Sequence, residues 1–212
     1  MSSSCGADHN FDGADPRFRR ALIIVVMINL SMFFVEMAAG KLAGSQALQA
    51  DALDFLADSV TYMVSFAVIG KSLRTRGLAA LGKGASLMLM GLWVMGETIY
   101  NVFVLQLPKA EVMGLIGALA LAANLISVVL LMAWRNGDAN VRSVWLCSRN
   151  DAIGNVAVML AAVGVFETGA AWPDLLVAAI MAALFLSSSV QIIRQSLGEL
   201  KGAESKHKAK CC

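Results

Sequence analysis

The sequence predicts an all-α integral membrane protein of six transmembrane helices, with both termini in the cytoplasm. Hydrophobic residues make up 58% of the 212 residues and charged residues only 15%, whereas a soluble domain has roughly 45–50% and about 25%. The apolar residues also gather in six runs, and about 20 apolar residues span a bilayer core as a helix. Soluble core helices show a polar stripe at every turn, which most of these runs lack.

The six runs cover residues 21–43, about 47–70, 78–105, 112–134, about 144–165 and 174–193. The breaks between them lie at residues 40–45, 71–76, 107–110, 135–142 and 168–173. Each break is short and carries Gly, Pro, Asn or charge, as turns usually do. Because short connections make successive helices antiparallel neighbours, we expect a bundle.

Lys and Arg residues set the predicted orientation. With six spans and the amino terminus inside, 15 of the 17 Lys and Arg residues, Lys83 among them, fall on the cytoplasmic side, and only Lys41 and Lys109 fall on the other. An excess of positive charge marks the cytoplasmic side of a membrane protein. The net charge of +2 is too small to indicate a nucleic-acid partner.

Three acidic residues in the second run carry the strongest chemical signal. Asp51, Asp54 and Asp58 are spaced i, i+3 and i+7, so they fall on one face of a helix. A charge inside a membrane costs about 2.5–3.5 kcal/mol, so ionisable residues in spans indicate function. Two carboxylates one turn apart repel each other unless one takes up a proton or a cation lies between them. The alternative is a water-lined crevice without a specific ligand.

The fifth run repeats the one-turn spacing with Cys147, Asp151 and Asn155. Two ligands from each of two helices would supply the four that tetrahedral zinc takes, and a thiolate favours zinc or cadmium over manganese or magnesium. Two other interpretations stay open. Cys147 could be a small buried hydrophobic residue, as most free cysteines are, and Asp151 could form a salt bridge with Arg149 near the membrane surface.

The order of these residues resembles that of the cation diffusion facilitator family. The chain reads Asn29-x6-Glu36-x3-Gly40, then Ser45-Gln-Ala-Leu-Gln-Ala-Asp51-Ala-Leu-Asp54-Phe-Leu-Ala-Asp58, and later Cys147-Ser-Arg-Asn-Asp151-Ala-Ile-Gly-Asn155. In that family the second and fifth helices each present an acidic or His residue four positions before an Asp. The resemblance implies that Asp54, Asp58 and Asp151 are ligands of a transport site. Cys147 stands where the family usually has His or Asp.

The resemblance also implies a domain plan. It comprises a cytoplasmic tail at residues 1–16, a six-helix cation efflux domain at 17–197 and a short cytoplasmic tail at 198–212. Most family members carry a ferredoxin-like domain after the sixth helix that helps them dimerise, and this chain resembles the subgroup without it. A homodimer would then rest on the membrane domain. No His lies in any run, since the only two are His9 and His207, so the family's frequent imidazole ligand is missing.

Other polar residues are weaker candidates. Inside the runs, five of them are expected as proton relays or as partners that orient the ligands, or else as polar groups satisfied within the bundle: Asn29, Glu36, Asp51, Glu97 and Asn155. In the tails, several residues could capture cytoplasmic metal or be incidental polar groups: Cys5, Asp8, His9, Asp12, His207, Cys211 and Cys212.

The sequence therefore predicts a divalent metal efflux transporter of the bacterial inner membrane, not an enzyme. Zinc or cadmium is the expected cargo, with cobalt or iron possible, and no resident cofactor is expected. Ligands must lose protons to bind metal, so metal loading releases protons and proton uptake expels metal. The alternatives are a passive divalent-cation channel or a membrane metal sensor. An intramembrane aspartyl protease is disfavoured because Asp54 and Asp58 share one helix.

Overall fold

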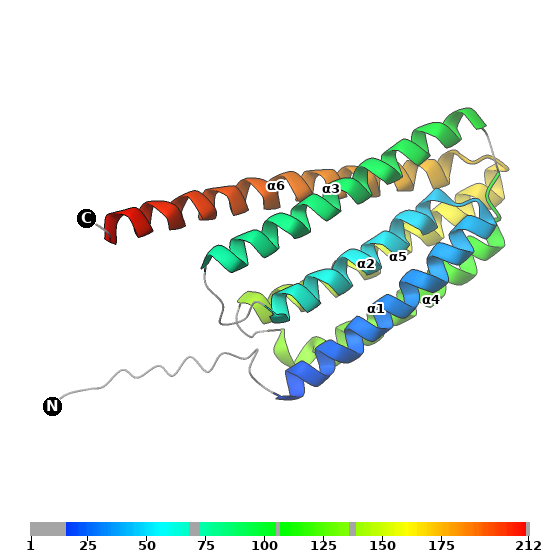
Figure 1. Ribbon diagram of the computed structural model, residues 1–212. Helices are drawn as coiled ribbons and strands as arrows, with labels where there is room; N and C mark the ends of the chain where they lie inside the picture. Colours follow the sequence, from blue (N-terminus) through cyan, green and yellow to red (C-terminus); the bar gives the residue numbers. More distant parts are fainter. Residues whose placement is uncertain (1–15, 68–72, 105–106, 136–138, 211–212) are drawn as a thin grey trace.

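The computed structural model describes residues 16–67, 73–104, 107–135 and 139–210 as a helix bundle (Figure 1). In chain order its helices are α1 (Pro16–Ala43), α2 (Gln46–Ala67), α3 (Leu73–Val104), α4 (Ala110–Leu131), α5 (Ala139–Thr168) and α6 (Trp172–Lys210). A short 3-10 turn, η2 (Met132–Trp134), follows α4. Each of the six apolar runs corresponds to one helix, which confirms the all-α prediction.

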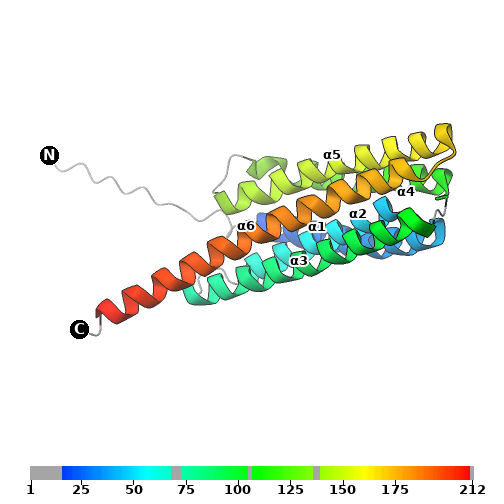
Figure 2. The same cartoon turned by 90° about the horizontal axis from the view of Figure 1, so that it is seen from above.

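The six helices pack as two groups. The most extensive packing joins α3 to α6, whereas α1, α2, α4 and α5 form a second group through the α4–α5, α1–α2 and α1–α4 contacts. Figures 1 and 2 show the α3/α6 pair lying along one side of the other four helices. Both α2 and α5 also contact α6. The two helices that carry the predicted ligands therefore lie at the boundary between the groups.

Five of the described helices contain a stretch that is long and apolar enough to cross a membrane. These stretches are Pro16–Ala43, Gly77–Val104, Ala110–Leu131, Ser148–Thr168 and Trp172–Gly198. The exception is α2, because every 18-residue stretch of it contains Asp51, Asp54 and Asp58. Its 22 residues rise about 33 Å, which is enough for a hydrocarbon core of about 30 Å. Its acidic residues, and not its length, set α2 apart.

The surface of the bundle is apolar, and polar groups lie inside. Phe103, Leu42 and Leu115 are 80%, 77% and 72% exposed, whereas Glu36 and Asn155 are fully buried. A water-soluble fold has the opposite distribution, while a lipid-facing surface must be apolar. Together with the apolar spans, this distribution identifies a multi-pass membrane protein.

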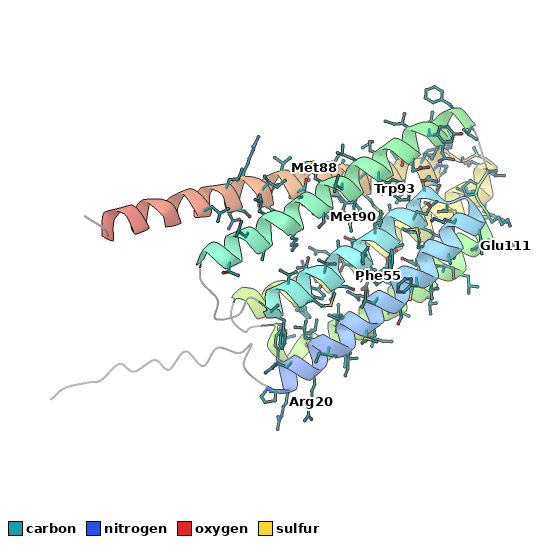
Figure 3. The ribbon with its side chains drawn as sticks, viewed as in Figure 1. Arg20, Phe55, Met88, Met90, Trp93 and Glu111 are labelled. Atoms are coloured by element: carbon teal, nitrogen blue, oxygen red, sulfur yellow. The ribbon has the colours of Figure 1, made fainter. Side chains whose placement is uncertain are left out.

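The two ends of the bundle are distinct. Figure 1 shows the start of α1 and the end of α6 at one end of the molecule, and Figure 3 shows Arg20 at that end and Glu111 at the opposite end. We call these the terminal end and the distal end. The α1–α2 turn, whose Ala43 carbonyl accepts a hydrogen bond from the N–H of Lys109 at 3.0 Å, lies at the distal end.

Four helices extend five residues or more beyond the predicted runs. The first residue is Pro16 in α1, Leu73 in α3 and Ala139 in α5, and α6 continues to Lys210 through the segment expected to be a tail. These extensions contain Ala, Leu, Lys, Arg and Glu, which favour helix, so the helices do not end where the apolar sequence ends. Lys83, counted above on the cytoplasmic side, lies within the apolar stretch of α3. The tail residues at 1–15 and 211–212 lie outside the described residues.

Candidate functional site

A tight turn between α1 and α2 sets the position of α2. Gly44 adopts a φ of 69°, which glycine tolerates and other residues disfavour, and the N–H of Ser45 donates to the carbonyl of Gly40 at 2.9 Å. Gly40 lies so close to α2 that an added Cβ would sit 2.9 Å from Cγ and 3.1 Å from the backbone nitrogen of Gln49. The helix therefore returns along α1 at close range and carries its acidic face into the bundle.

Three aspartates from two helices meet inside the bundle. The carboxyl groups of Asp54 and Asp58 on α2 each lie at hydrogen-bonding distance from that of Asp151 on α5. All three side chains are half-buried. A hydrogen bond between two carboxyl groups needs a proton on one of them, and charged carboxylates this close repel each other. The cluster therefore needs protons or a cation to offset this repulsion.

Two further side chains act on this cluster, one by a hydrogen bond and one by its charge, and the sequence analysis missed both. Tyr62 is buried one turn after Asp58, and its hydroxyl donates a hydrogen bond to Asp58 Oδ2. From α3, the positive charge of Lys83 attracts the Asp58 carboxylate. The i, i+4 spacing could have indicated Tyr62. No spacing could have indicated Lys83, because the contact between α2 and α3 is tertiary.

The other predicted residues of α5 are only partly described. Asn155 is fully buried one turn after Asp151, and neither polar atom of its side chain has a hydrogen-bond partner among the described residues. The backbone of Cys147 lies in α5 one turn before Asp151, but its side chain lies outside the described part of the chain. Its role as a ligand stays a prediction. Arg149, the alternative partner of Asp151, donates to Asn150 Oδ1 at 3.3 Å.

A second acid pair lies between α1 and α2. Glu36 and Asp51 are 0% and 2% exposed, and their carboxyl groups lie at hydrogen-bonding distance from each other. Among the described residues, no donor reaches either oxygen of Glu36 or Oδ2 of Asp51. The negative charge of Asp54 acts on Glu36, and that of Asp51 acts on Asp54. Such a pair needs a shared proton or a cation, which fits the predicted part in proton relay.

Two weaker candidates differ in their surroundings. Asn29 is buried on α1, two turns before Glu36, and its Oδ1 has no partner within the described ranges. Glu97 is half-buried on α3, and its backbone carbonyl accepts a hydrogen bond from Asn101 Nδ2 at 2.8 Å. The described contacts do not bring Glu97 to the aspartates, so its role stays a prediction.

The described side chains do not form a complete metal cage. No group of three or more His, Cys, Asp and Glu residues is arranged to hold a metal ion within the part of the chain that the structure describes. As predicted ligands, the three aspartates would supply oxygen atoms from two helices, whereas zinc takes four ligands in its common tetrahedral geometry. A complete site thus needs another ligand, for which Cys147, one turn from Asp151, is the nearest sequence candidate.

Comparison with known proteins identifies a family and several relatives. Residues 22–200 match the cation efflux transmembrane domain. The chain is 30% identical to the cadmium, cobalt and zinc/H(+)-K(+) antiporter of Bacillus subtilis, over 91% of this chain and 65% of that protein. It is 29% identical to zinc transporter ZitB of Yersinia pestis, over 88% of this chain and 64% of that protein. It is 26% identical to metal cation efflux system protein CzcD of Cupriavidus metallidurans, over 92% of this chain and 65% of that protein.

The chain spans slightly less than two thirds of the length of these relatives. Within that length the match runs through all six helices, including the two that bring Asp54, Asp58 and Asp151 together. The family match confirms the resemblance predicted from the spacing of these residues, and the chain belongs to the cation efflux family.

Proposed function

We propose that the protein exports divalent metal ions from the cytoplasm in exchange for protons, with zinc or cadmium as the main cargo and cobalt or iron possible. The observation that carries the proposal is the meeting of Asp54, Asp58 and Asp151 inside an apolar bundle. Carboxylates bind zinc directly, and ionisable residues at this depth mark ion pathways. The name of the Bacillus subtilis relative includes cadmium, cobalt and zinc, that of the Yersinia pestis relative includes zinc, and both support the same class of cargo.

The proposed topology has six crossings, with both termini in the cytoplasm. The sixth crossing is α2, which spans despite its acidic residues because neighbouring helices cover its polar face. The start of α1 and the end of α6 lie at the same end of the bundle (Figure 1), which supports an even number of crossings. The terminal end is then cytoplasmic and the distal end faces the opposite side. A homodimer in the lipid bilayer would be held by the membrane-spanning helices.

The proposed ligands are Asp54, Asp58, Cys147 and Asp151. In the empty site, the protons shared among the carboxyl groups and the charge of Lys83 offset the repulsion between the aspartates. An arriving metal ion replaces these positive charges, and the protons leave as the ligands bind it. Proton uptake from the distal side then returns the acids to their protonated form, and the metal ion departs.

Alternating exposure of the site needs two parts that move against each other. The α3/α6 pair and the four-helix group are suitable parts, since the ligands on α2 and α5 lie at the boundary between them. Movement of the pair would open one end of this boundary while closing the other. Because Lys83 belongs to the pair and Asp58 to the four-helix group, such movement also changes the charge near the ligands.

Inverted membrane vesicles test the function, because they present the cytoplasmic face to the medium. Vesicles with an acidic lumen should accumulate zinc, and a protonophore that collapses the gradient should abolish the accumulation. Repeating the assay with and without potassium separates the two counter-ions named for the Bacillus subtilis relative. Accumulation that persists unchanged after the protonophore would support a channel, and zinc binding without any accumulation would support a sensor.

A further inference from the structure

Asp174 stands outside the aspartate cluster, and its side chain makes an unusually complete set of contacts. It lies in the first turn of α6 and is 1% exposed. Its Oδ1 accepts hydrogen bonds from Ser45 Oγ at 2.6 Å and from the N–H of Ala47 at 3.1 Å, and its Oδ2 accepts from the N–H of Gln46 at 2.8 Å. All three donors belong to the start of α2, about 128 residues earlier in the chain.

These contacts satisfy the beginning of α2. The first N–H groups of a helix have no partner within the helix, and the partial positive charge there favours a carboxylate. A residue just before a helix normally supplies such a cap. Here Ser45 does so for Leu48, whose N–H donates to Ser45 Oγ at 3.1 Å. The carboxylate of Asp174, from a different helix, satisfies the two preceding N–H groups.

The contacts also join the two helix groups. Asp174 belongs to the α3/α6 pair, whereas Ser45, Gln46 and Ala47 begin the helix that carries the aspartates. The distal end of the boundary holds small residues that allow close packing, and Ala47 and Ala178 there are both 0% exposed. Asp54 follows Ala47 by seven residues, or about 10 Å along the helix. Any movement at this contact therefore reaches the ligands through a short, rigid segment.

We propose that Asp174 is a positioning residue that clamps α2 to α6 at the distal end and keeps this end of the boundary closed. If the proposed function holds, the clamp is closed while the aspartates are exposed at the terminal end, and it opens when the metal ion leaves. The clamp itself depends on contacts that involve none of the proposed metal ligands.

Labelling of a buried cysteine tests the clamp. The reporter Ala178→Cys lies one turn after Asp174, and maleimide modification of Cys at this position is read by peptide mass spectrometry, which counts native cysteines separately. In the folded, monodisperse fraction, Asp174→Ala should raise the labelling rate by about tenfold, since hydrogen bonds to a charged acceptor are strong. Asp174→Asn should raise it less, Asp174→Glu should restore protection, and Ser45→Ala should raise it by about twofold or more.

Glu111→Ala is the matched control, because Glu111 is an exposed acid in the first turn of α4 at the same end of the bundle. It should leave labelling unchanged. Equal labelling in the parent and in Asp174→Ala, or an equal rise in Asp174→Ala and Glu111→Ala, would overturn the proposal. If no Asp174 variant folds, Ser45→Ala decides, and unchanged labelling in that variant overturns it.

Labelling does not require transport, so the two proposals fail separately. A parent protein that accumulates no zinc, but whose reporter becomes accessible in Asp174→Ala, would refute the transport function and support the clamp. A parent that transports zinc, and whose reporter stays protected in every variant, would refute the clamp alone.

Discussion

Tyr62→Phe should weaken metal binding about tenfold while leaving the fold intact. The substitution removes only the hydroxyl that donates to Asp58 Oδ2. The ring stays, so its packing in the buried cluster with Leu22, Val25 and Leu131 is kept. The hydroxyl orients one proposed ligand, and without it the carboxylate has a wider choice of orientation before metal arrives.

The magnitude follows from the contacts that remain. A hydrogen bond to a charged group contributes about 1.5–3 kcal/mol, and loss of a partner that orients a metal ligand weakens affinity by roughly 10–100-fold. Asp58 keeps its contact with Asp151 and the attraction of Lys83. We therefore expect the lower limit, about tenfold or about 1.4 kcal/mol.

The assay is competition for zinc between the detergent-purified protein and a chelating dye at one fixed pH. The chain offers a matched control, because its only other tyrosine is Tyr100, which is 64% exposed on α3. Tyr100→Phe should bind zinc as the parent does. A Kd for Tyr62→Phe equal to that of the parent, or an equal loss in both variants, would refute the assignment of Tyr62 to the site.

Three further sets of substitutions test other parts of the structure. Asp54→Ala or Asp151→Ala should abolish zinc transport in vesicles at normal expression, since each removes a proposed ligand. Glu167 is an exposed acid on α5, and the control Glu167→Gln should transport normally. Transport at the parent rate in either Ala variant would remove that aspartate from the site. Cys147→Ser should weaken cadmium and zinc binding, and Cys147→His should recover zinc binding more fully than cadmium binding because imidazole is a harder ligand than thiolate. Identical cadmium-to-zinc competition in the parent and both variants would mean that Cys147 only packs. Gly40→Ala should lower the thermal unfolding midpoint, because its Cβ would meet Gln49 at 2.9 Å. Gly82 has open space around it, so Gly82→Ala should gain about 1 kcal/mol of helix propensity. Equal shifts of the unfolding midpoint in both variants would contradict the close approach of α1 and α2.

Much of the fold could be predicted from the local pattern of apolar and polar residues. Long apolar runs and short polar breaks predicted all six helices, because an apolar run and its length are properties of consecutive residues. The predicted ends were wrong where polar residues with good helix propensity continue a helix beyond its apolar stretch, as α6 does to Lys210. The acidic face of α2 could likewise be predicted from local sequence, since the spacing of Asp51, Asp54 and Asp58 places them together on any helix.

Local patterns in the sequence were therefore sufficient to predict the class of protein, its helices and the candidate ligands on each helix. Which helices meet could be seen only in the folded bundle, where Asp151 joins Asp54 and Asp58, Lys83 lies near them, and Asp174 caps α2. The physical reason is that helical periodicity places side chains only relative to their own axis. Contacts between helices depend on the rotation and depth of each helix in the bundle, which the packing of the whole chain sets.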